Sequence, residues 1–470
     1  MSIKLPNRPV PSRIPTSLLV AAWAVAVVLA ASCLVWALLS PAGDSNQTAY
    51  SATPTRAAQS AATKPAATTV PAQPAATKAP APTSPSVKAT QAPSNPAPPT
   101  TAPKPTALPV QETFGYGIQV NGFDDPDGSI AMTKQLGMTW IKQQVVWGSL
   151  EHEKGNMDWS GLDRVVRKAN KADLKIMLSI VTSPTWSHPA IGPGGDDKEG
   201  IKAPPDDLNA YANFVAQVVQ REKDLGYPVH AVEVWNEQNL SREWRTSPQK
   251  IDAAKYMQML TATYKKVKAI DPNIIVISGA PSPTGVDNGI DATDDLNYLK
   301  QMVSYGLLNS ADCIGIHHNG YNLPPDVPYQ DTPKNPKAAT ATNYPAPFDP
   351  AKLHHSWSFY TTLQESARIV KPKPLCITEF GWASSVGIST PVRSGFEFAG
   401  DNTLQEQADY IIKAYQLMKQ WGFVKIAFLW NLNFFNVTDD RSTTDNAIYS
   451  VLTPGGMPRP AFEALGKMPK

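Results

Sequence analysis

Eight apolar runs of strand length recur between residues 111 and 470, and segments with a helical pattern separate them. The runs cover residues 114–120, 139–145, 175–180, 231–235, 274–278, 313–317, 375–379 and 425–430. Most are continuously apolar, as expected of parallel strands that are covered on both faces. Strands that alternate with helices in this way predict an α/β fold with a parallel sheet.

The helical patterns are clearest in two of the connecting segments. Between the third and fourth runs, apolar residues repeat at three- and four-residue spacing over 208–219, and residues 408–418 do the same between the seventh and eighth. Such spacing places the apolar side chains on one face of a helix. Weaker patterns of the same kind cover residues 128–136, 160–171, 250–269, 294–307, 351–370 and 459–467.

Eight strand-helix units in about 360 residues predict a (β/α)8 TIM barrel. The competing fold is a doubly wound open sheet, which normally carries a glycine-rich phosphate-binding turn after its first strand. Here the first run is followed by Asn-Gly-Phe-Asp-Asp at 121–125, which is not such a turn. We therefore expect residues 111–470 to form one barrel domain, which we expect to be monomeric.

The N-terminal 40 residues have the pattern of a membrane anchor. Lys4, Arg8 and Arg13 precede the 22 uncharged residues 18–39, a run long enough to cross a hydrocarbon core about 30 Å thick. We expect a cytoplasmic stub and a single transmembrane helix, with the rest of the chain outside the cell because the positive charges lie before the span. The alternatives are a cleaved signal peptide, whose apolar core is usually about 7–15 residues, and a lipoprotein signal that ends at Cys33.

Residues 41–110 consist almost wholly of Ala, Pro, Thr and Ser with scattered Lys, and contain one aromatic residue, Tyr50. A segment of this composition cannot bury enough apolar surface to offset the entropy of ordering it. We predict a disordered linker that favours the polyproline II conformation and holds the barrel away from the membrane.

Charge and cysteine content exclude several kinds of partner. The formal net charge is +2 and the predicted barrel has no run of Lys and Arg, so no nucleic acid partner is predicted. Cys313 and Cys376 lie in apolar runs, which favours buried reduced thiols over a disulfide. The neighbouring pair His317 and His318 lacks further ligands in a recognisable motif, so we predict no metal and no other cofactor.

Two glutamates end strand-like runs: Glu237 follows the fourth and Glu379 ends the seventh. In a barrel both then face the mouth formed by the carboxyl ends of the strands. An isolated Glu is usually a member of an ordinary ion pair, but two at strand ends, each near a Trp, suit the hydrolysis of sugar bonds. We expect ionised Glu379 to raise the pKa of Glu237 by like-charge repulsion, which makes Glu237 the acid and Glu379 the nucleophile.

Both motifs resemble those of a known group of enzymes. Trp235-Asn236-Glu237 and Thr378-Glu379-Phe380-Gly-Trp are similar to the acid/base and nucleophile segments of the large clan of retaining (β/α)8 glycoside hydrolases that includes cellulases, β-mannanases, β-xylosidases and β-galactosidases. The similarity extends over residues 113–465. It implies that Asn236 bonds the sugar 2-hydroxyl, and retention implies carboxyl groups about 5–5.5 Å apart.

The same resemblance implies further site residues. Trp430, at the end of the eighth run, matches the aromatic floor beneath the sugar, and Trp147, Trp186 and Trp382 also follow strand ends, although each could instead cap the core. His317 and Tyr321 match residues that orient the nucleophile or the substrate.

One position departs from the clan, in which many families have an Arg on the second strand. Lys142 would supply the same charge if its side chain points inward. Residues 319–356 form the longest insertion, and we expect it to shape the cleft because insertions at this end of a barrel surround the active site.

These residues together predict a membrane-tethered, extracellular retaining glycosidase that acts on β-linked oligo- or polysaccharides. A cell-surface transglycosylase would use the same pair of glutamates and differ only in its acceptor. A non-catalytic glycan-binding barrel on the same linker is the alternative outside enzymology.

Overall fold

The computed structural model describes residues 114–191, 202–339, 354–434 and 444–470. All of them belong to one unit of the chain, Pro103–Lys470. Within these residues, no helix is both long enough and apolar enough to cross a membrane. The predicted transmembrane helix (18–39) and the predicted linker (41–110) lie outside the described residues and stay predictions.

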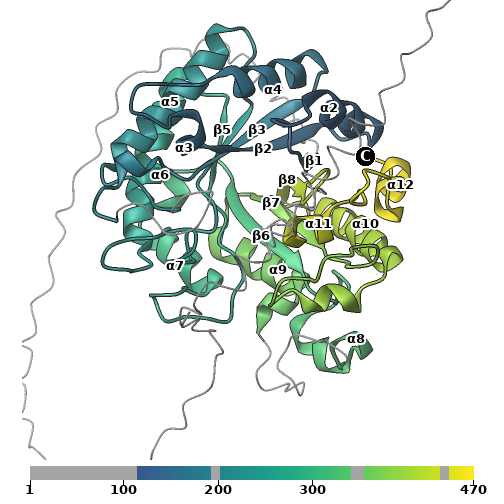
Figure 1. Ribbon diagram of the computed structural model, residues 1–470. Coiled ribbons are helices and arrows are strands. Elements are labelled where there is room, and N and C mark those ends of the chain that lie inside the picture. The colour runs from purple at the N-terminus through teal and green to yellow at the C-terminus, as the bar shows by residue number, and fades with distance from the viewer. Residues whose placement is uncertain (1–113, 192–201, 340–353, 435–443) are drawn as a thin grey trace, which may run out of the picture. The chain divides into compact units, whose positions relative to one another are not determined.

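Eight parallel strands form one sheet in the order β5-β4-β3-β2-β1-β8-β7-β6, and lie at the centre of the molecule (Figure 1). The strands are β1 Gly115–Gln119, β2 Trp140–Val146, β3 Lys175–Val181, β4 Ala231–Val234, β5 Ile275–Ser278, β6 Ile314–Gly320, β7 Leu375–Trp382 and β8 Val424–Leu429. A parallel bridge between Ile277 and Cys313 joins β5 to the start of β6, and the Gly315 amide donates to Ser278 Oγ at 3.0 Å. The sheet is therefore closed, which confirms the predicted (β/α)8 barrel.

Helices surround the strands, as Figure 1 shows for α2, α4, α5, α6, α7, α9 and α10. The bounds are α2 Pro126–Gln135, α3 Trp147–Leu150, α4 Ser160–Lys171, α5 Leu208–Asp224, α6 Ala253–Ile270, α7 Asp295–Ser304, α8 Pro336–Ala339, α9 Phe359–Val370, α10 Leu404–Trp421, α11 Thr444–Tyr449 and α12 Pro460–Lys467. Asp207, Asp252 and Asp294 cap α5, α6 and α7, because each side chain accepts a hydrogen bond from a first-turn amide.

α9 starts eight residues later than the sequence pattern predicts. The predicted segment 351–370 becomes a short 3-10 turn, His355–Trp357, followed by α9, which begins at Phe359. The reason is local: the Ser358 side chain accepts a hydrogen bond from the Thr361 amide and so caps α9 at that point. Residues 351–353 lie outside the described part of the chain.

β6 and β7 extend three residues past their predicted ends. β6 and β7 pair with each other as far as Gly320 opposite Trp382, whereas the apolar pattern predicts their ends at residues 317 and 379. Mutual pairing extends β6 into the polar residues 318–320 and β7 through residues 380–382. Glu379 therefore lies within β7 and not at its end.

An apolar layer fills the barrel interior. Its buried members are Trp140, Met177, Ala231, Ile277, Cys313, Cys376, Ile426 and Phe428. Cys313 and Cys376 are joined by a disulfide, with Cα atoms 5.7 Å apart. The prediction of reduced thiols is wrong, because neighbouring parallel strands bring the two side chains to adjacent inward positions that sequence spacing alone does not show.

Candidate active site

Two predicted carboxylates meet at one histidine. Glu237 follows β4, Glu379 lies in β7, and His317 lies in β6. His317 Nδ1 is 3.2 Å from Glu237 Oε1 and 3.7 Å from Glu379 Oε2. All three residues are buried. The fold thus brings together side chains that are up to 142 positions apart in the sequence.

The backbone around Glu237 adopts an unusual conformation. Trp235 has φ 74° and Glu237 has φ 43°, a left-handed region that bulky residues rarely occupy. The amide of Glu237 donates to Ala280 O at 3.1 Å, and the indole of Trp235 donates to Glu243 O at 2.8 Å. Strained backbone of this kind persists only where surrounding contacts hold it, and it is concentrated at functional sites.

Lys142 points into the barrel from β2. Its Nζ lies 2.9 Å from Glu379 Oε1 and donates to Thr378 O at 3.2 Å. Burial would lower the pKa of Lys142, but Glu233 and Glu379 outweigh burial and raise it. The buried ammonium therefore remains charged beside Glu379. Because Lys142 is completely buried, it is placed to act on Glu379 and not to touch a substrate.

A third carboxylate, Glu233, lies beneath the predicted pair and was not identified from the sequence. It is completely buried in β4, 3.3 Å from Lys142 Nζ and 3.9 Å from His317 Nε2. The sequence does contain a pattern that indicates Glu233: it is the only charged residue in the apolar run 231–235, as Lys142 is in the run 139–145. A buried charge in each of two strands predicts that they pair inside the barrel.

Arg242 is the second residue that the sequence did not reveal. Its Nη2 lies 2.8 Å from Glu237 Oε2, and its side chain is 66% exposed. It also lies 3.7 Å from Glu243 Oε1 through Nε. Arg242 belongs to the loop after β4, and nothing in the local sequence separates it from other surface arginines.

The charged neighbours of Glu237 and His317 determine the protonation states of these two residues. Burial would raise the pKa of Glu237, but its hydrogen bond with His317 and the charge of Arg242 outweigh burial and lower it. Burial would lower the pKa of His317, whereas Glu379 and Glu237 raise it. Glu237 is therefore anionic in the free site, contrary to the prediction that Glu379 raises its pKa, because the cations on the other side of Glu237 have the larger effect.

The predicted tryptophans fall into two groups. Trp147 and Trp382 are 2% and 1% exposed. The ring of Trp147 stacks on Phe214, with ring centroids 4.9 Å apart. The indole N–H of Trp382 donates a hydrogen bond to Leu323 O at 2.9 Å. The structure does not support the predicted contact of these two rings with substrate, because neither presents a free face; both pack in the core.

The other predicted binding residues remain accessible. Trp430 and Trp186 are partly exposed, and Trp430 packs against Phe434 at 5.0 Å. Trp186 donates through Nε1 to Glu151 O at 3.1 Å. Asn236 is partly exposed beside Glu237. The ring of Tyr321 stacks on Trp357, with ring centroids 5.2 Å apart. Tyr321 thus packs in an aromatic cluster beyond β6.

Several buried polar atoms around this end of the barrel take no hydrogen bond within the described residues. They include both side-chain polar atoms of Gln119, both ring nitrogens of His188, and the Oδ1 atoms of Asn236 and Asn319. Gln119 ends β1 in register with Lys142, so it shares the inward face. Buried polar groups are normally paired, and unpaired ones at strand ends are suited to bonding a ligand rich in hydroxyl groups.

One cluster of possible metal ligands lies elsewhere, at the start of α7. Ligand atoms of Asp294, His354 and His355 lie within 4.8 Å of one another. His354 Nδ1 accepts a hydrogen bond from the Ser356 amide at 3.3 Å, which leaves the ring proton on Nε2, 2.9 Å from Asp294 Oδ2. His355 Nε2 lies 2.8 Å from Asp295 Oδ1. The cluster is best described as two His–Asp pairs, since a metal would need the Nε2 lone pair of His354.

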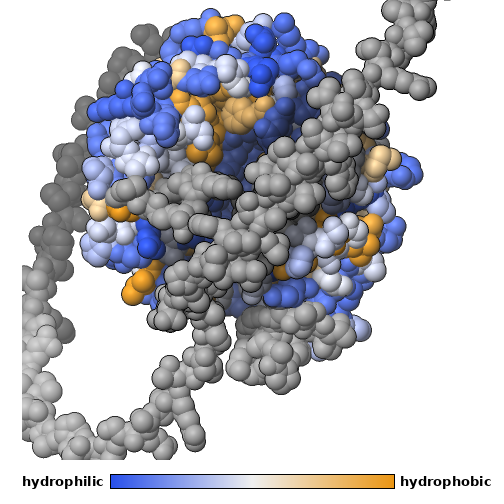
Figure 2. All heavy atoms as spheres, in the orientation of Figure 1, coloured by the Kyte–Doolittle hydropathy of each residue, from blue (hydrophilic) through white to orange (hydrophobic). Residues whose placement is uncertain are grey.

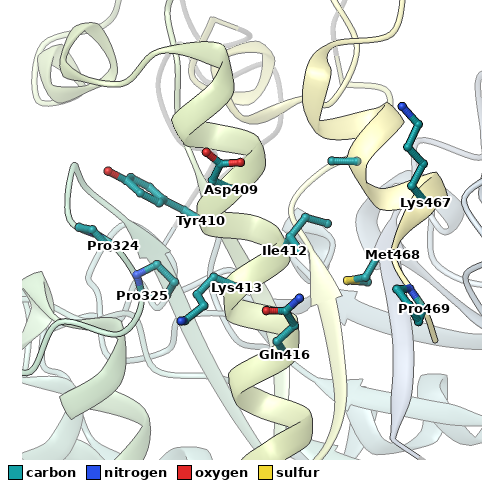
Figure 3. A pocket seen from close by; sticks show the side chains of 11 residues that line it. Pro324, Pro325, Asp409, Tyr410, Ile412, Lys413, Gln416, Lys467, Met468 and Pro469 are labelled. Carbon is teal, nitrogen blue, oxygen red and sulfur yellow. The ribbon is translucent and has the colours of Figure 1, made fainter.

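The described pockets add little to the site itself. One of ≈ 600 Å³ lies between α10, α12 and Pro324–Pro325 (Figure 3), and none of the candidate site residues lines it. Another of ≈ 430 Å³ is lined by Ser241, Arg245 and Gln249, in the loop that also carries Arg242. On the face shown in Figure 2 the coloured surface is mostly hydrophilic, with small separate hydrophobic patches.

Comparison with known proteins shows that the fold of this chain is similar to that of several solved structures. No family model matches the chain, and no curated protein matches it. Among solved structures, a family 39 glycoside hydrolase from Bacteroides cellulosilyticus WH2 is 19% identical with a TM-score of 0.52, over 76% of this chain and 63% of that one. A family 39 β-xylosidase from Caulobacter crescentus is 16% identical with a TM-score of 0.49, over 76% of this chain and 71% of that one.

A third neighbour is a family 10 endo-β-1,4-xylanase described as psychrophilic, which is 16% identical with a TM-score of 0.47 over 76% of this chain and 97% of that one. At these identities the comparison bears on the fold alone. The chain covers less than two thirds of the length of the family 39 enzyme from Bacteroides. The resemblance suggested by the sequence motifs is thus shown at the level of architecture: this chain is a (β/α)8 barrel similar to those of solved glycoside hydrolases.

Proposed function

We propose that the protein is a retaining glycosidase for β-linked glycans, with Glu379 as nucleophile and Glu237 as acid/base. The observation that carries the proposal is the convergence of both carboxylates on His317, at 3.2 and 3.7 Å from the same ring nitrogen. A pair of carboxylates on one barrel mouth is the arrangement that glycoside hydrolysis uses.

The separation of the two groups supports retention. Because Glu237 Oε1 and Glu379 Oε2 both lie near His317 Nδ1, the distance between these two oxygens is at most about 7 Å. Retaining enzymes have carboxyl groups about 5–5.5 Å apart, whereas inverting enzymes need about 6.5–9.5 Å to admit a water molecule. The limit on this one pair of oxygens admits the spacing that retention requires.

The roles follow from the neighbours of each carboxylate. Lys142 favours the anionic form of Glu379, which then attacks the anomeric carbon while Glu237 protonates the departing oxygen. The carbon–oxygen bond to the leaving group breaks as the glycosyl ester on Glu379 forms. In the second step Glu237, now anionic, takes a proton from water, and the water oxygen displaces Glu379.

Glu237 must gain a proton before it can act as the acid. Arg242 holds Glu237 as an anion in the free site, but its side chain is largely exposed and so can move. We propose that a bound leaving-group sugar separates Arg242 from Glu237, which removes a cation and lets the pKa of Glu237 rise. His317 remains in contact with both carboxylates throughout.

The substrate class and place of action rest on broader features. Partly exposed Trp430 and the unpaired polar atoms of Gln119 and Asn236 suit a sugar, which offers apolar ring faces and hydroxyl groups. The apolar run 18–39 and the Pro-rich segment 41–110 support a membrane-anchored enzyme that acts outside the cell.

The test uses the full chain with 4-nitrophenyl β-glycosides and β-linked polysaccharides. NMR of the first product should show the β-anomer, which is retention. Glu379→Gln should abolish turnover, and a 2-deoxy-2-fluoro glycoside that is a substrate should label Glu379 covalently. Glu237→Gln should slow substrates with poor leaving groups about 100-fold or more and spare activated ones.

Azide should restore turnover of activated substrates by Glu237→Gln with formation of the β-glycosyl azide. Glu222→Gln, which changes a buried glutamate near the C-terminal end of α5, is the matched control and should remain active. First release of the α-anomer, or full activity of Glu379→Gln, would refute the assignment.

A further inference from the structure

Glu233 has no part in the two-step reaction described above, yet it is the most enclosed carboxylate of the site. It lies in the interior of β4 with no exposed surface, and neither of its oxygens takes a well-aligned hydrogen bond within the described residues. Its closest charged neighbours are Lys142 Nζ at 3.3 Å and His317 Nε2 at 3.9 Å. A buried carboxylate with no hydrogen bonds is costly unless cations compensate it.

The same two cations also face the catalytic pair. Lys142 contacts Glu379, and His317 Nδ1 faces both Glu237 and Glu379. Each cation therefore has Glu233 on one side and a catalytic carboxylate on the other. The charge of Glu233 also acts on two buried tyrosines, Tyr211 and Tyr256. Their hydroxyls donate hydrogen bonds to Ile180 O and Val234 O. Burial raises the pKa of both tyrosines, so they stay neutral.

The charges of the site can be counted at each stage of the proposed reaction. The group counted consists of three carboxylates and three cations: Glu233, Glu237, Glu379, Lys142, His317 and Arg242. With Glu237 protonated and Glu379 ionised, the negative charges of Glu233 and Glu379 equal the positive charges of Lys142 and a protonated His317. In the glycosyl-enzyme ester, Glu379 is neutral and Glu237 is ionised, so the count is unchanged. In the free site Glu237 is also ionised, and Arg242 supplies the additional positive charge. The group is neutral at every stage only if His317 is an imidazolium.

We propose that Glu233 is a positioning residue that keeps His317 protonated and Lys142 fixed beneath the catalytic carboxylates. The proposal rests on the glycosidase function proposed above. Burial opposes protonation of His317, but Glu379 and Glu237 raise its pKa. Glu233 lies on the other side of the ring, with Oε1 3.9 Å from Nε2, where its charge favours the imidazolium in the same sense. A protonated His317 donates toward Glu237 from Nδ1 and leaves Nε2–H toward Glu233.

The first test needs no variant. In the full chain labelled with 15N-histidine, the ring nitrogens of His317 should have imidazolium chemical shifts at the pH of maximal kcat. The signal is assigned by its loss in His317→Gln. A neutral His317 ring at that pH would overturn the proposal.

The second test compares Glu233→Gln with Glu233→Asp and Glu222→Gln. Glu233→Gln removes the charge but keeps the shape, and should lower the pKa of His317 by about one unit or more. It should also reduce kcat at pH 7 at least about tenfold with little change in KM, and move the alkaline limb of the kcat profile to lower pH. Glu233→Asp keeps the charge and should recover most of the histidine shift. Glu222→Gln controls for the loss of any buried glutamate and should leave both readouts unchanged.

The results separate this proposal from the one on which it rests. An unchanged His317 titration in folded Glu233→Gln refutes the role of Glu233 whatever the reaction is, and if that variant does not fold, the titration of the unaltered protein decides. Full activity of Glu379→Gln refutes the glycosidase assignment but leaves the histidine titration as an independent result, because no substrate is present in that measurement.

Discussion

The ammonium of Lys142 lies 2.9 Å from the carboxylate of Glu379, although 237 positions separate the two residues. Both are buried, so the charge of each depends on the other. Removing one partner of a buried ion pair leaves the other uncompensated. In the mechanism proposed above, Lys142 therefore acts through Glu379 and not through contact with substrate.

Lys142→Met should lower kcat about 100-fold, because the negative charge of Glu379 loses its closest buried cation. Lys142→Arg should retain more activity, since the guanidinium keeps a positive charge beside Glu379. Steady-state kinetics on an aryl glycoside would measure both. Lys265→Met, at an exposed position of α6, serves as the control, and equal activity of Lys142→Met and Lys265→Met would contradict the prediction.

Arg242→Gln should shift the pH dependence of hydrolysis. Arg242 lowers the pKa of Glu237, so removal of its charge should raise that pKa. Since the acid form of Glu237 is needed for the first step, the alkaline limb of kcat/KM should move to higher pH. The profile of Arg245→Gln should match that of the unaltered protein, because among the described residues the side chain of Glu237 pairs with Arg242 and His317 and not with Arg245. A shift to lower pH in Arg242→Gln would show that Arg242 acts otherwise.

Trp430 and Trp382 form a matched pair for separating binding from packing. Trp430→Ala should raise KM about tenfold or more with the melting temperature nearly unchanged, because the ring is partly exposed. Trp382→Ala should instead reduce the free energy of unfolding by about 3–5 kcal/mol, as expected for loss of a buried Trp. KM of the folded fraction should be unaltered. The reverse pattern would place Trp382 at the sugar.

The Cys313–Cys376 disulfide predicts a simple thiol count. The unreduced, denatured full chain should contain one reactive thiol, Cys33, because the other two cysteines are joined. Replacing both with Ala should destabilise the folded barrel by about 2–4 kcal/mol, since the link spans 63 residues of the unfolded chain. Three thiols before reduction would show that the bond is absent in solution.

Glu222 should make stability fall with rising pH. Burial and the neighbouring charge of Asp163 raise the pKa of Glu222 to about 8, from 4.5. Between these values the folded state binds the proton and the unfolded state does not, so the free energy of unfolding decreases as pH rises through this window. Glu222→Gln should flatten that dependence. Chemical denaturation of both proteins at pH 5 and pH 8 would measure the difference.

The fold and the convergence of Glu237 and Glu379 could be predicted from the sequence because both depend on local patterns. Apolar runs mark buried parallel strands, and Glu237 and Glu379 follow from their place near the ends of two of them. Lys142 was recognisable as the charged residue of its run. Its partner Glu233 was not identified, although it carries the same signal, because the pairing between β2 and β4 residues depends on how the strands are tilted around the barrel.

What escaped prediction depends on contacts across the fold. The disulfide requires that β6 and β7 be neighbours in register, and the ion pair of Arg242 depends on the path of one loop. The burial of Trp147 and Trp382 is set by side chains from helices, such as Phe214 and Phe359, that no pattern near either Trp reveals. The pKa of Glu237 differs from the expectation because two cations outside its own motif determine it.

The covalent link between Cys313 and Cys376 also concerns the order in which the chain matures. Both cysteines belong to the apolar layer inside the barrel and have no exposed surface, so a disulfide exchange enzyme has no access to the sulfur atoms in the folded barrel. We therefore expect the bond to form while β6 and β7 are paired but the barrel is still open. We expect the bond to form only where thiols can be oxidised, so that production of this domain under reducing conditions would yield a barrel that lacks it.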